Sequence, residues 1–169
     1  MHEIPRNMLH ILHADNNDTE RELFKHILKR FDSTVKVTEA SNIKQVVEVL
    51  DHAFILPDLI FMDYVMYPLD GVACTKQIRN SNKFCHLPVV MYANAMSSEQ
   101  LEAAYAGGSS YYLQKPDDVS ELEIILPWLV KQLPFNHRAP VFDNFVLTAR
   151  RILNPQDSIH EIYQRNSCF

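Results

Sequence analysis

Glycine is scarce in this chain, with three residues among 169. Neither G-x-x-x-x-G-K nor G-x-G-x-x-G occurs, which argues against a glycine-rich loop that binds the phosphates of a nucleotide. Long apolar runs are also missing: none approaches the roughly 18 residues that cross a membrane, and the N-terminus has no long apolar core for export. We therefore expect a cytoplasmic protein without a membrane span.

Positive charge is not in excess, because the formal net charge is −5. Such a balance argues against direct binding to nucleic acid. The cysteines are Cys74, Cys85 and Cys168, which form no C-x-x-C pair and predict free thiols in a reducing compartment. No H-E-x-x-H motif occurs, and His10 and His13 lie three apart on a predicted strand, so they point to opposite faces. We expect no zinc site.

Strand and helix patterns alternate along residues 7–133, which we interpret as one domain. Apolar runs predict strands near residues 8–14, 33–40, 57–63, 87–92 and 110–114. Helices are predicted after them, near residues 18–31, 42–50, 71–80, 97–107 and 119–133. Five such units imply an α/β fold, a doubly wound parallel sheet between two layers of helices.

Three of the predicted strands lead directly into a charged residue: Asp15, Asp63 and Lys115. If the strands are parallel neighbours, these side chains converge at the carboxyl edge of the sheet, where open α/β sheets bind ligands. Two acids beside an ammonium suit Mg²⁺ and a phosphoryl group, because oxygen ligands hold the metal and lysine supplies a point charge. Asp63 could then attack phosphorus and become an aspartyl phosphate.

Residues 7–133 resemble the receiver domain of two-component response regulators, and four blocks in a fixed order carry the resemblance. The blocks are Leu12-His13-Ala14-Asp15-Asn16, then Asp63 with Met66 and Asp70-Gly71, then Leu87 to Ala93, then Lys115-Pro116. The resemblance implies a flavodoxin-like (βα)5 fold with sheet order 2-1-3-4-5. In that order the first and third strands are central neighbours, which brings their two acids together.

The resemblance also implies a role for each matching position. Asp63 takes the place of the phosphoacceptor, and Lys115 takes the place of the family's lysine. Asp15 and Asn16 take the adjacent acidic pair. The family's metal, Mg²⁺, would be held by these residues, by Asp63 and by the backbone carbonyl of Val65.

Two positions of the switch and metal machinery depart from the family pattern. Asn16 replaces an acid, so we expect weak Mg²⁺ binding, because affinity depends on the charge of the ligands. Ala93 stands where the family has Ser or Thr, whose hydroxyl would bond the phosphoryl group. Tyr112 matches the aromatic switch residue, and we expect it to couple weakly, or through a donor further along the loop such as Ser97 or Ser98.

The C-terminal extension, residues 134–169, falls outside the resemblance. Apolar residues at helical spacing predict a helix over residues 141–153 with a buried face, and hence a largely helical extension. That face would pack on the domain itself, or it would bind a partner or a second copy of the chain, giving a homodimer. The pattern does not separate these alternatives.

The leading hypothesis is a stand-alone receiver in phosphorelay signal transduction. It would take a phosphoryl group onto Asp63 from a histidine kinase or phosphotransfer protein and switch a surface that binds a downstream protein. The alternative is a degenerate receiver that binds partners without phosphorylation. An enzyme is not expected: the haloacid dehalogenase phosphatases need a second acid two residues after the nucleophile, where this chain has Val65.

Overall fold

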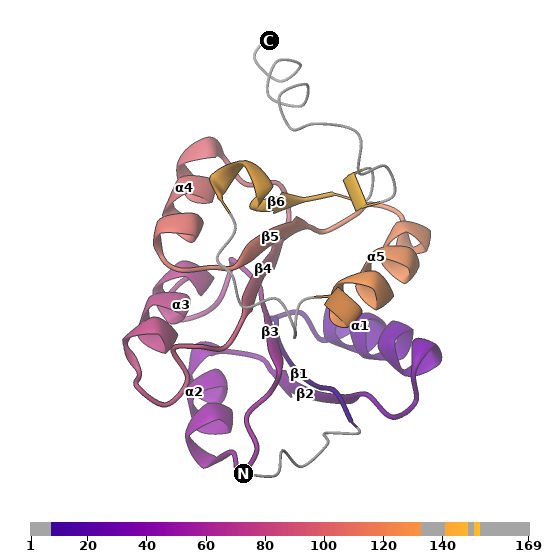
Figure 1. Cartoon of the computed structure of the whole chain (residues 1–169), viewed down its shortest axis with the longest axis horizontal. Helices are drawn as coiled ribbons and strands as arrows, with labels where there is room; N and C mark the ends of the chain where they lie inside the picture. The colour runs from indigo at the N-terminus through magenta and orange to yellow at the C-terminus, as the bar shows by residue number, and fades with distance from the viewer. Residues whose placement is uncertain (1–7, 133–140, 149–150, 153–169) are drawn as a thin grey trace, which may run out of the picture.

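The computed structural model describes residues 8–132, 141–148 and 151–152. Along these residues five strands alternate with five helices, and a 3-10 turn and a short strand follow (Figure 1). The elements are β1 (His10–Ala14), α1 (Asp18–Phe31), β2 (Lys36–Ala40), α2 (Ile43–His52), β3 (Leu59–Met62), α3 (Gly71–Asn80), β4 (Val89–Ala93), α4 (Ser98–Ala106), β5 (Tyr111–Gln114), α5 (Val119–Gln132), the 3-10 turn η2 (Phe142–Asn144) and β6 (Val146–Leu147). Among the described helices, none is long and apolar enough to cross a membrane.

The strands form one parallel sheet in the order β2-β1-β3-β4-β5-β6. The predicted order 2-1-3-4-5 is confirmed, and β6 extends the sheet by one strand. Helices α1 and α5 cover one face, whereas α2, α3 and α4 cover the other (Figure 1). This three-layer arrangement is the flavodoxin-like fold that the sequence predicts, and it directs the carboxyl ends of all the strands to one edge.

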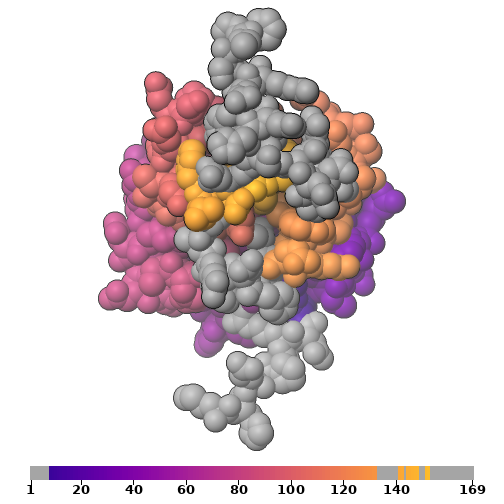
Figure 2. All heavy atoms as spheres, turned by 45° about the horizontal axis from the view of Figure 1, so that its top comes forward, coloured from indigo at the N-terminus to yellow at the C-terminus, as the bar shows by residue number. Residues whose placement is uncertain are grey.

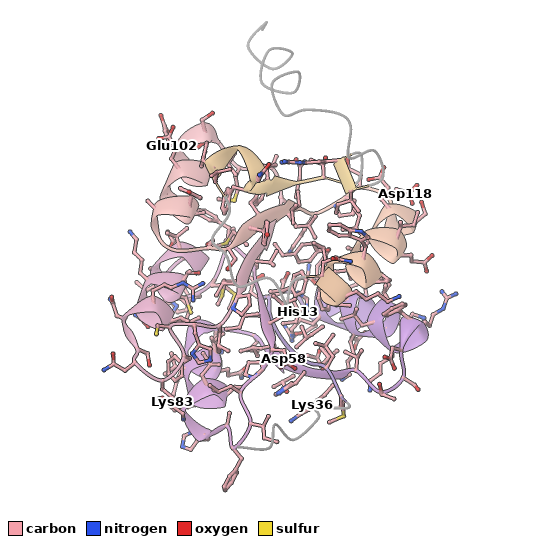
Figure 3. All side chains as sticks on the ribbon, in the orientation of Figure 1. His13, Lys36, Asp58, Lys83, Glu102 and Asp118 are labelled. Atoms are coloured by element: carbon pink, nitrogen blue, oxygen red, sulfur yellow. The ribbon has the colours of Figure 1, made fainter. Side chains whose placement is uncertain are left out.

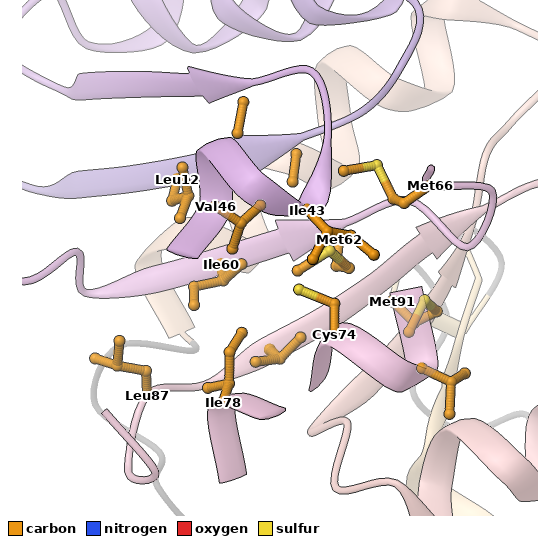
Figure 4. Packing of buried hydrophobic residues seen from close by; sticks show 14 of the residues in the cluster. Leu12, Ile43, Val46, Ile60, Met62, Met66, Cys74, Ile78, Leu87 and Met91 are labelled. Carbon is orange, nitrogen blue, oxygen red and sulfur yellow. The ribbon is translucent and has the colours of Figure 1, made fainter. Parts of the chain in front are cut away.

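The core lies on both faces of the sheet because side chains alternate along each strand. Leu12 of β1 belongs to the cluster under α2, α3 and α4, with Ile60, Met62 and Met91 from β3 and β4 (Figure 4). Its neighbour Ile11 belongs to the opposite cluster, under α1 and α5. Strands β1, β3 and β4 are buried at every position, which is why they read as continuous apolar runs in the sequence.

The helix predicted over residues 141–153 is wrong over its first half. Residues 142–144 form the turn η2, and residues 146–147 form β6, which pairs with β5 in the register Tyr112↔Val146 and Leu113↔Leu147. Helical spacing over so short a segment could not reveal that β5 offers an unpaired edge, and pairing with that edge satisfies the backbone. Residues 151–152 are helical, and the rest of the predicted helix lies outside the described residues.

Of the predicted apolar face, Phe145 and Ile152 are buried and Phe142 and Val146 are partly buried, while Ala149 and Leu153 lie outside the described residues. Phe145 is completely buried in the cluster under α2, α3 and α4. Its ring lies 5.4 Å from that of Tyr105 on α4, and the ring of Phe142 lies 5.1 Å from the same tyrosine. In Figure 2 the segment lies at the surface between α4 and α5. Residues 142–147 therefore pack on the domain of their own chain.

Candidate functional site

Each of the three predicted site residues is the first residue after a strand. Asp15 follows β1, Asp63 follows β3 and Lys115 follows β5. Backbone hydrogen bonds continue the sheet at these positions: the N–H of Asp63 donates to the carbonyl of Ala14 at 2.8 Å, and the N–H of Lys115 donates to the carbonyl of Ala93 at 2.8 Å. The sheet itself therefore sets the spacing of the three side chains, as the sequence predicts.

Lys115 bridges the two carboxylates. Its Nζ donates to Oδ2 of Asp15 at 2.5 Å and lies 3.2 Å from Oδ1 of Asp63. The remaining carboxylate oxygens accept backbone hydrogen bonds, Oδ1 of Asp15 from Asn17 at 2.8 Å and Oδ2 of Asp63 from Val65 at 3.1 Å. Both acids are buried, and a buried charge needs such partners to remain charged.

Burial and charge shift the pKa values of this group in defined directions. Burial raises the pKa of Asp63, and the charge of Asp15 raises it further, while Lys115 and the hydrogen bond from Val65 oppose the rise. Burial lowers the pKa of Lys115, but its hydrogen bonds and attraction to both acids outweigh burial, so the net shift is upward. Lys115 is therefore a fixed positive charge against two acids, the arrangement in which an anionic group can be held next to Asp63.

The three side chains open into a cavity of about 400 Å³ at the carboxyl edge of the sheet. It is lined by Asp15, Asn16, Asn17, Glu20, Asp63, Tyr64, Val65, Ala93, Asn94, Ala95, Met96, Gln100 and Lys115. Sequence reasoning missed the contributions of Glu20, Asn94 and Gln100. Asn94 is the first residue after β4, two places beyond the end predicted for this strand.

Gly71 allows the loop after β3 to close tightly beside Asp63. A Cβ atom at this position would lie 2.2 Å from the backbone oxygen of Asp63, closer than any real contact. The N–H of Gly71 donates to the carbonyl of Tyr64 at 2.8 Å, and the side chain of Asp70 caps α3 by accepting from Ala73 at 2.7 Å. The Asp70-Gly71 pair of the sequence therefore holds the start of α3 against the acid.

The residues that line the cavity fit a Mg²⁺ ion. Asp15 and Asp63, which carry carboxylates, line the cavity together with Asn16, which carries a neutral amide, and Val65. Within the described residues no three His, Cys, Asp or Glu side chains form a group that could hold a metal. Two carboxylates with a carbonyl suit an ion that keeps several of its waters, as Mg²⁺ does in proteins.

The two predicted switch positions lie beside this cavity. Ala93 ends β4, and its buried methyl group offers no hydrogen bond to the pocket. Tyr112 is also buried, and its hydroxyl donates to the carbonyl oxygen of Asn94 at 2.9 Å. Burial raises the pKa of Tyr112 to about 12, so the hydroxyl remains a donor at neutral pH. The aromatic ring is thus tied to the residue that follows Ala93.

The donors predicted further along this loop lie outside the cavity. Neither Ser97 nor Ser98 lines it. The Ser97 hydroxyl caps α4 by accepting from the N–H of Gln100 at 3.2 Å, and the Gln100 side chain accepts from the N–H of Ser97 at 2.8 Å. This reciprocal capping box holds the serine at the helix start.

His13 is a buried polar residue within β1. Its ring stacks on Phe24, with centroids 3.9 Å apart, and lies between the sheet and the α1–α5 layer (Figure 3). Neither ring nitrogen has a hydrogen-bond partner in the described part of the chain. Burial lowers the pKa of His13 to about 3, and the charges of Lys115 and Arg21 add to the effect. The ring is therefore neutral and part of the core.

Known proteins similar in sequence to this chain are two-component response regulators. The two-component response regulator ORR8 of Oryza sativa subsp. japonica is 27% identical over 120 residues, which are 71% of this chain and 97% of that protein. The two-component response regulator ARR17 of Arabidopsis thaliana is 29% identical over 125 residues, 68% of this chain and 80% of that protein.

Solved structures show the same fold. The phosphorylated cyanobacterial phytochrome response regulator RcpA matches with a TM-score of 0.70, over 79% of this chain and 99% of that one, at 17% identity. At that identity the likeness concerns the fold alone. The family model described as the response regulator receiver domain matches residues 11–126, well over half of the chain. The chain therefore belongs to the receiver domain family of two-component response regulators.

Proposed function

We propose that this receiver accepts a phosphoryl group on Asp63. The observation that carries the proposal is the pairing around this acid: Oδ1 lies 3.2 Å from the Lys115 ammonium, and the side chain opens into the cavity at the edge of the sheet. A carboxylate next to a fixed positive charge can bring a phosphoryl group close without strong repulsion. The cavity also has room for the group, whose oxygens would lie among Lys115, Asp15 and the β4–α4 loop.

The reaction is a transfer between two nucleophiles. An oxygen of Asp63 forms a bond to phosphorus while the P–N bond of a phosphohistidine breaks, and the imidazole leaves with the electron pair and takes a proton from water. Asp15, Asp63 and the Val65 carbonyl would hold Mg²⁺, which when bound neutralises charge on the phosphoryl oxygens. Lys115 holds a further oxygen and keeps the two acids from repelling each other.

The proposed setting is a phosphorelay in the cytoplasm. The donor would be a histidine kinase or a phosphotransfer protein, as the two-component names of the relatives suggest. The output would be binding to a downstream protein, without direct contact with nucleic acid and without an enzymatic reaction of its own. The rotamer or mobility of Tyr112 would convey the state of Asp63 to that surface.

A second function, constitutive binding of a partner without phosphorylation, is favoured by a separate observation. Tyr112 is buried, with its hydroxyl on the Asn94 carbonyl and its N–H on the carbonyl of Phe145 at 2.9 Å. These contacts hold Tyr112 in one position, so the surface around it would have the same shape whether or not Asp63 is phosphorylated. Asn16 and Ala93, which we expect to weaken the metal site and the link to the switch, point the same way.

Intact-mass measurement after incubation with Mg²⁺ and acetyl phosphate tests the proposal. We expect the wild type to gain one phosphoryl group and Asp63→Asn to gain none. Asp117→Asn, which removes an exposed acid near the same edge, is the matched control and should label like the wild type. Equal labelling of wild type and Asp63→Asn would refute the assignment, and no labelling of either would favour constitutive binding.

A further inference from the structure

Asn94 lines the cavity at the edge of the sheet, and the family resemblance assigns it no role. A phosphoryl group on Asp63 would carry three oxygens that accept hydrogen bonds. Lys115 and the metal ligands account for some of them, but Ala93 offers only a methyl group, and Ser97 and Ser98 do not line the cavity. None of the residues that the resemblance assigns therefore supplies a side-chain donor from the β4–α4 loop.

Asn94 occupies the position from which such a donor could act. It directly follows β4, as Asp15 follows β1, Asp63 follows β3 and Lys115 follows β5. Continuing the β4–β5 register by one residue beyond Ala93↔Gln114 places Asn94 beside Lys115. Asn94 is exposed and is one of the residues that line the cavity, and a side-chain amide has two N–H donors.

We propose that the side-chain amide of Asn94 donates a hydrogen bond to an oxygen of the phosphoryl group on Asp63. It would replace the hydroxyl that Ala93 lacks. The proposal rests on the proposed function, because it needs a phosphoryl group on that acid. Asn94 lies one residue further along the chain than Ala93 and lines the same cavity. A hydrogen bond from its amide would move the β4–α4 loop toward the phosphoryl group.

The backbone of Asn94 links this donor to the rest of the molecule. Its carbonyl oxygen accepts from the hydroxyl of Tyr112 at 2.9 Å, and the N–H of Tyr112 donates to the carbonyl of Phe145 at 2.9 Å. A hydrogen bond from the Asn94 side chain to the phosphoryl group would therefore shift the residue whose carbonyl accepts from the Tyr112 hydroxyl. Beyond the ring it reaches the extension that β6 joins to the sheet. The expected path runs from the cavity through Asn94 and Tyr112 to Phe145.

The test uses beryllium trifluoride, which binds a carboxylate oxygen as a mimic of a phosphoryl group, added with Mg²⁺ to the full chain. In Asn94→Ala we expect the Kd of the mimic to rise by roughly tenfold or more, the loss typical of a hydrogen bond to a charged group. Asn82→Ala, at an exposed asparagine in the loop before β4, is the matched control and should bind like the wild type. Adding Ala93→Thr to Asn94→Ala should restore most of the affinity, because it supplies the missing hydroxyl.

A second readout follows the path to the extension. On addition of the mimic, the amide resonances of Tyr112 and Phe145 should shift in the wild type and shift much less in Asn94→Ala. Val37 on β2, at the far edge of the sheet, serves as the reference. The melting temperature of Asn94→Ala should be close to that of the wild type, as is usual for a change at the surface. A folding defect would then not explain weaker binding of the mimic.

The outcomes separate this inference from the proposed function. Unchanged affinity and unchanged shifts in Asn94→Ala would overturn the inference alone. Weaker binding that Ala93→Thr does not restore would overturn it as well, because the loss would then not be that of a donor. A wild type that binds no mimic at all would overturn both the inference and the proposed function.

Discussion

The N–H of Tyr112 donates to the carbonyl oxygen of Phe145 at 2.9 Å, which joins the aromatic residue beside the candidate site to the C-terminal extension. The same tyrosine donates its hydroxyl to the Asn94 carbonyl at the rim of the cavity. One residue therefore contacts the rim of the cavity through its side chain and the extension, just before β6, through its backbone. Any partner that binds over β5 would meet the extension first, because residues 142–147 lie between α4 and α5 at the surface (Figure 2).

Phe145 should contribute strongly to the stability of the domain. It is completely buried, and truncation of a buried phenylalanine typically costs about 3–5 kcal/mol because contacts are lost and a cavity remains. We expect Phe145→Ala to lower the melting temperature by roughly 6 °C or more. Val141→Ala, at a residue that is 64% exposed, is the control and should leave the temperature nearly unchanged. Equal melting temperatures for both variants would contradict the packing described here.

The affinity for Mg²⁺ should depend on the charge at position 16. Asn16 lines the cavity and supplies a neutral oxygen beside two carboxylates. Asn16→Asp adds a charge close to the ion, and we expect the affinity to rise by roughly tenfold or more. Calorimetric titration with MgCl₂ measures it, with Asn82→Asp as the control for a general change of charge. No gain in Asn16→Asp would show that this side chain does not face the metal.

Removing the charge of Lys115 should raise the pKa of Asp63 beyond its already elevated value. Burial and the charge of Asp15 raise that pKa, whereas Lys115 is the largest opposing influence. In Lys115→Gln, burial and the charge of Asp15 still raise the pKa of Asp63, and only the backbone hydrogen bond from Val65 still lowers it. Carbon-13 NMR titration of the carboxyl resonance measures the shift, and Lys25→Gln, which loses a surface pair with Glu39, is the control. An unchanged or lower pKa in Lys115→Gln would contradict the assigned geometry.

His13 should make the domain less stable as the pH falls below about 6.5. The unfolded chain takes up a proton near the ordinary pKa of 6.5, but the folded chain does so only near pH 3, because burial lowers the pKa of the ring. Between these values the unfolded state binds more protons, so the free energy of unfolding falls by about 1.4 kcal/mol per pH unit.

His13→Leu removes this titration. Urea unfolding at pH 6.5 and 4.5 should therefore show the wild type losing about 2–3 kcal/mol more than His13→Leu over that interval. The control is His86→Gln, at an exposed histidine, which should lose as much as the wild type. Parallel pH profiles for wild type and His13→Leu would show that the folded ring is protonated.

Much of the fold and of the acid pocket follows from the sequence for a physical reason. Buried parallel strands read as apolar runs, and a charged residue directly after such a run can only lie at the edge of the sheet, so Asp15, Asp63 and Lys115 could be placed together. The order of the strands was predicted from the family resemblance alone, because no local sequence pattern shows which strands pair with each other.

Other features depend on contacts that no local pattern encodes. Residues 146–147 form a strand only because the edge of β5 is there to pair with, so helical spacing was misleading. The place of Asn94 depends on how the loop leaves β4, which a single residue type does not reveal. The burial of His13 runs against its polarity, and only the stacking on Phe24 and the surrounding layers explain it.

On the proposed function, Asp63 and no other acid of the cavity carries the phosphoryl group. The most direct measurement is tandem mass spectrometry of peptides from wild-type protein labelled with acetyl phosphate and Mg²⁺, digested and analysed before the acyl phosphate hydrolyses. The phosphoryl group should be found on the peptide that contains Asp63 and on no other. A phosphoryl group on Asp15 or on a histidine, with Asp63 unmodified, would contradict the account.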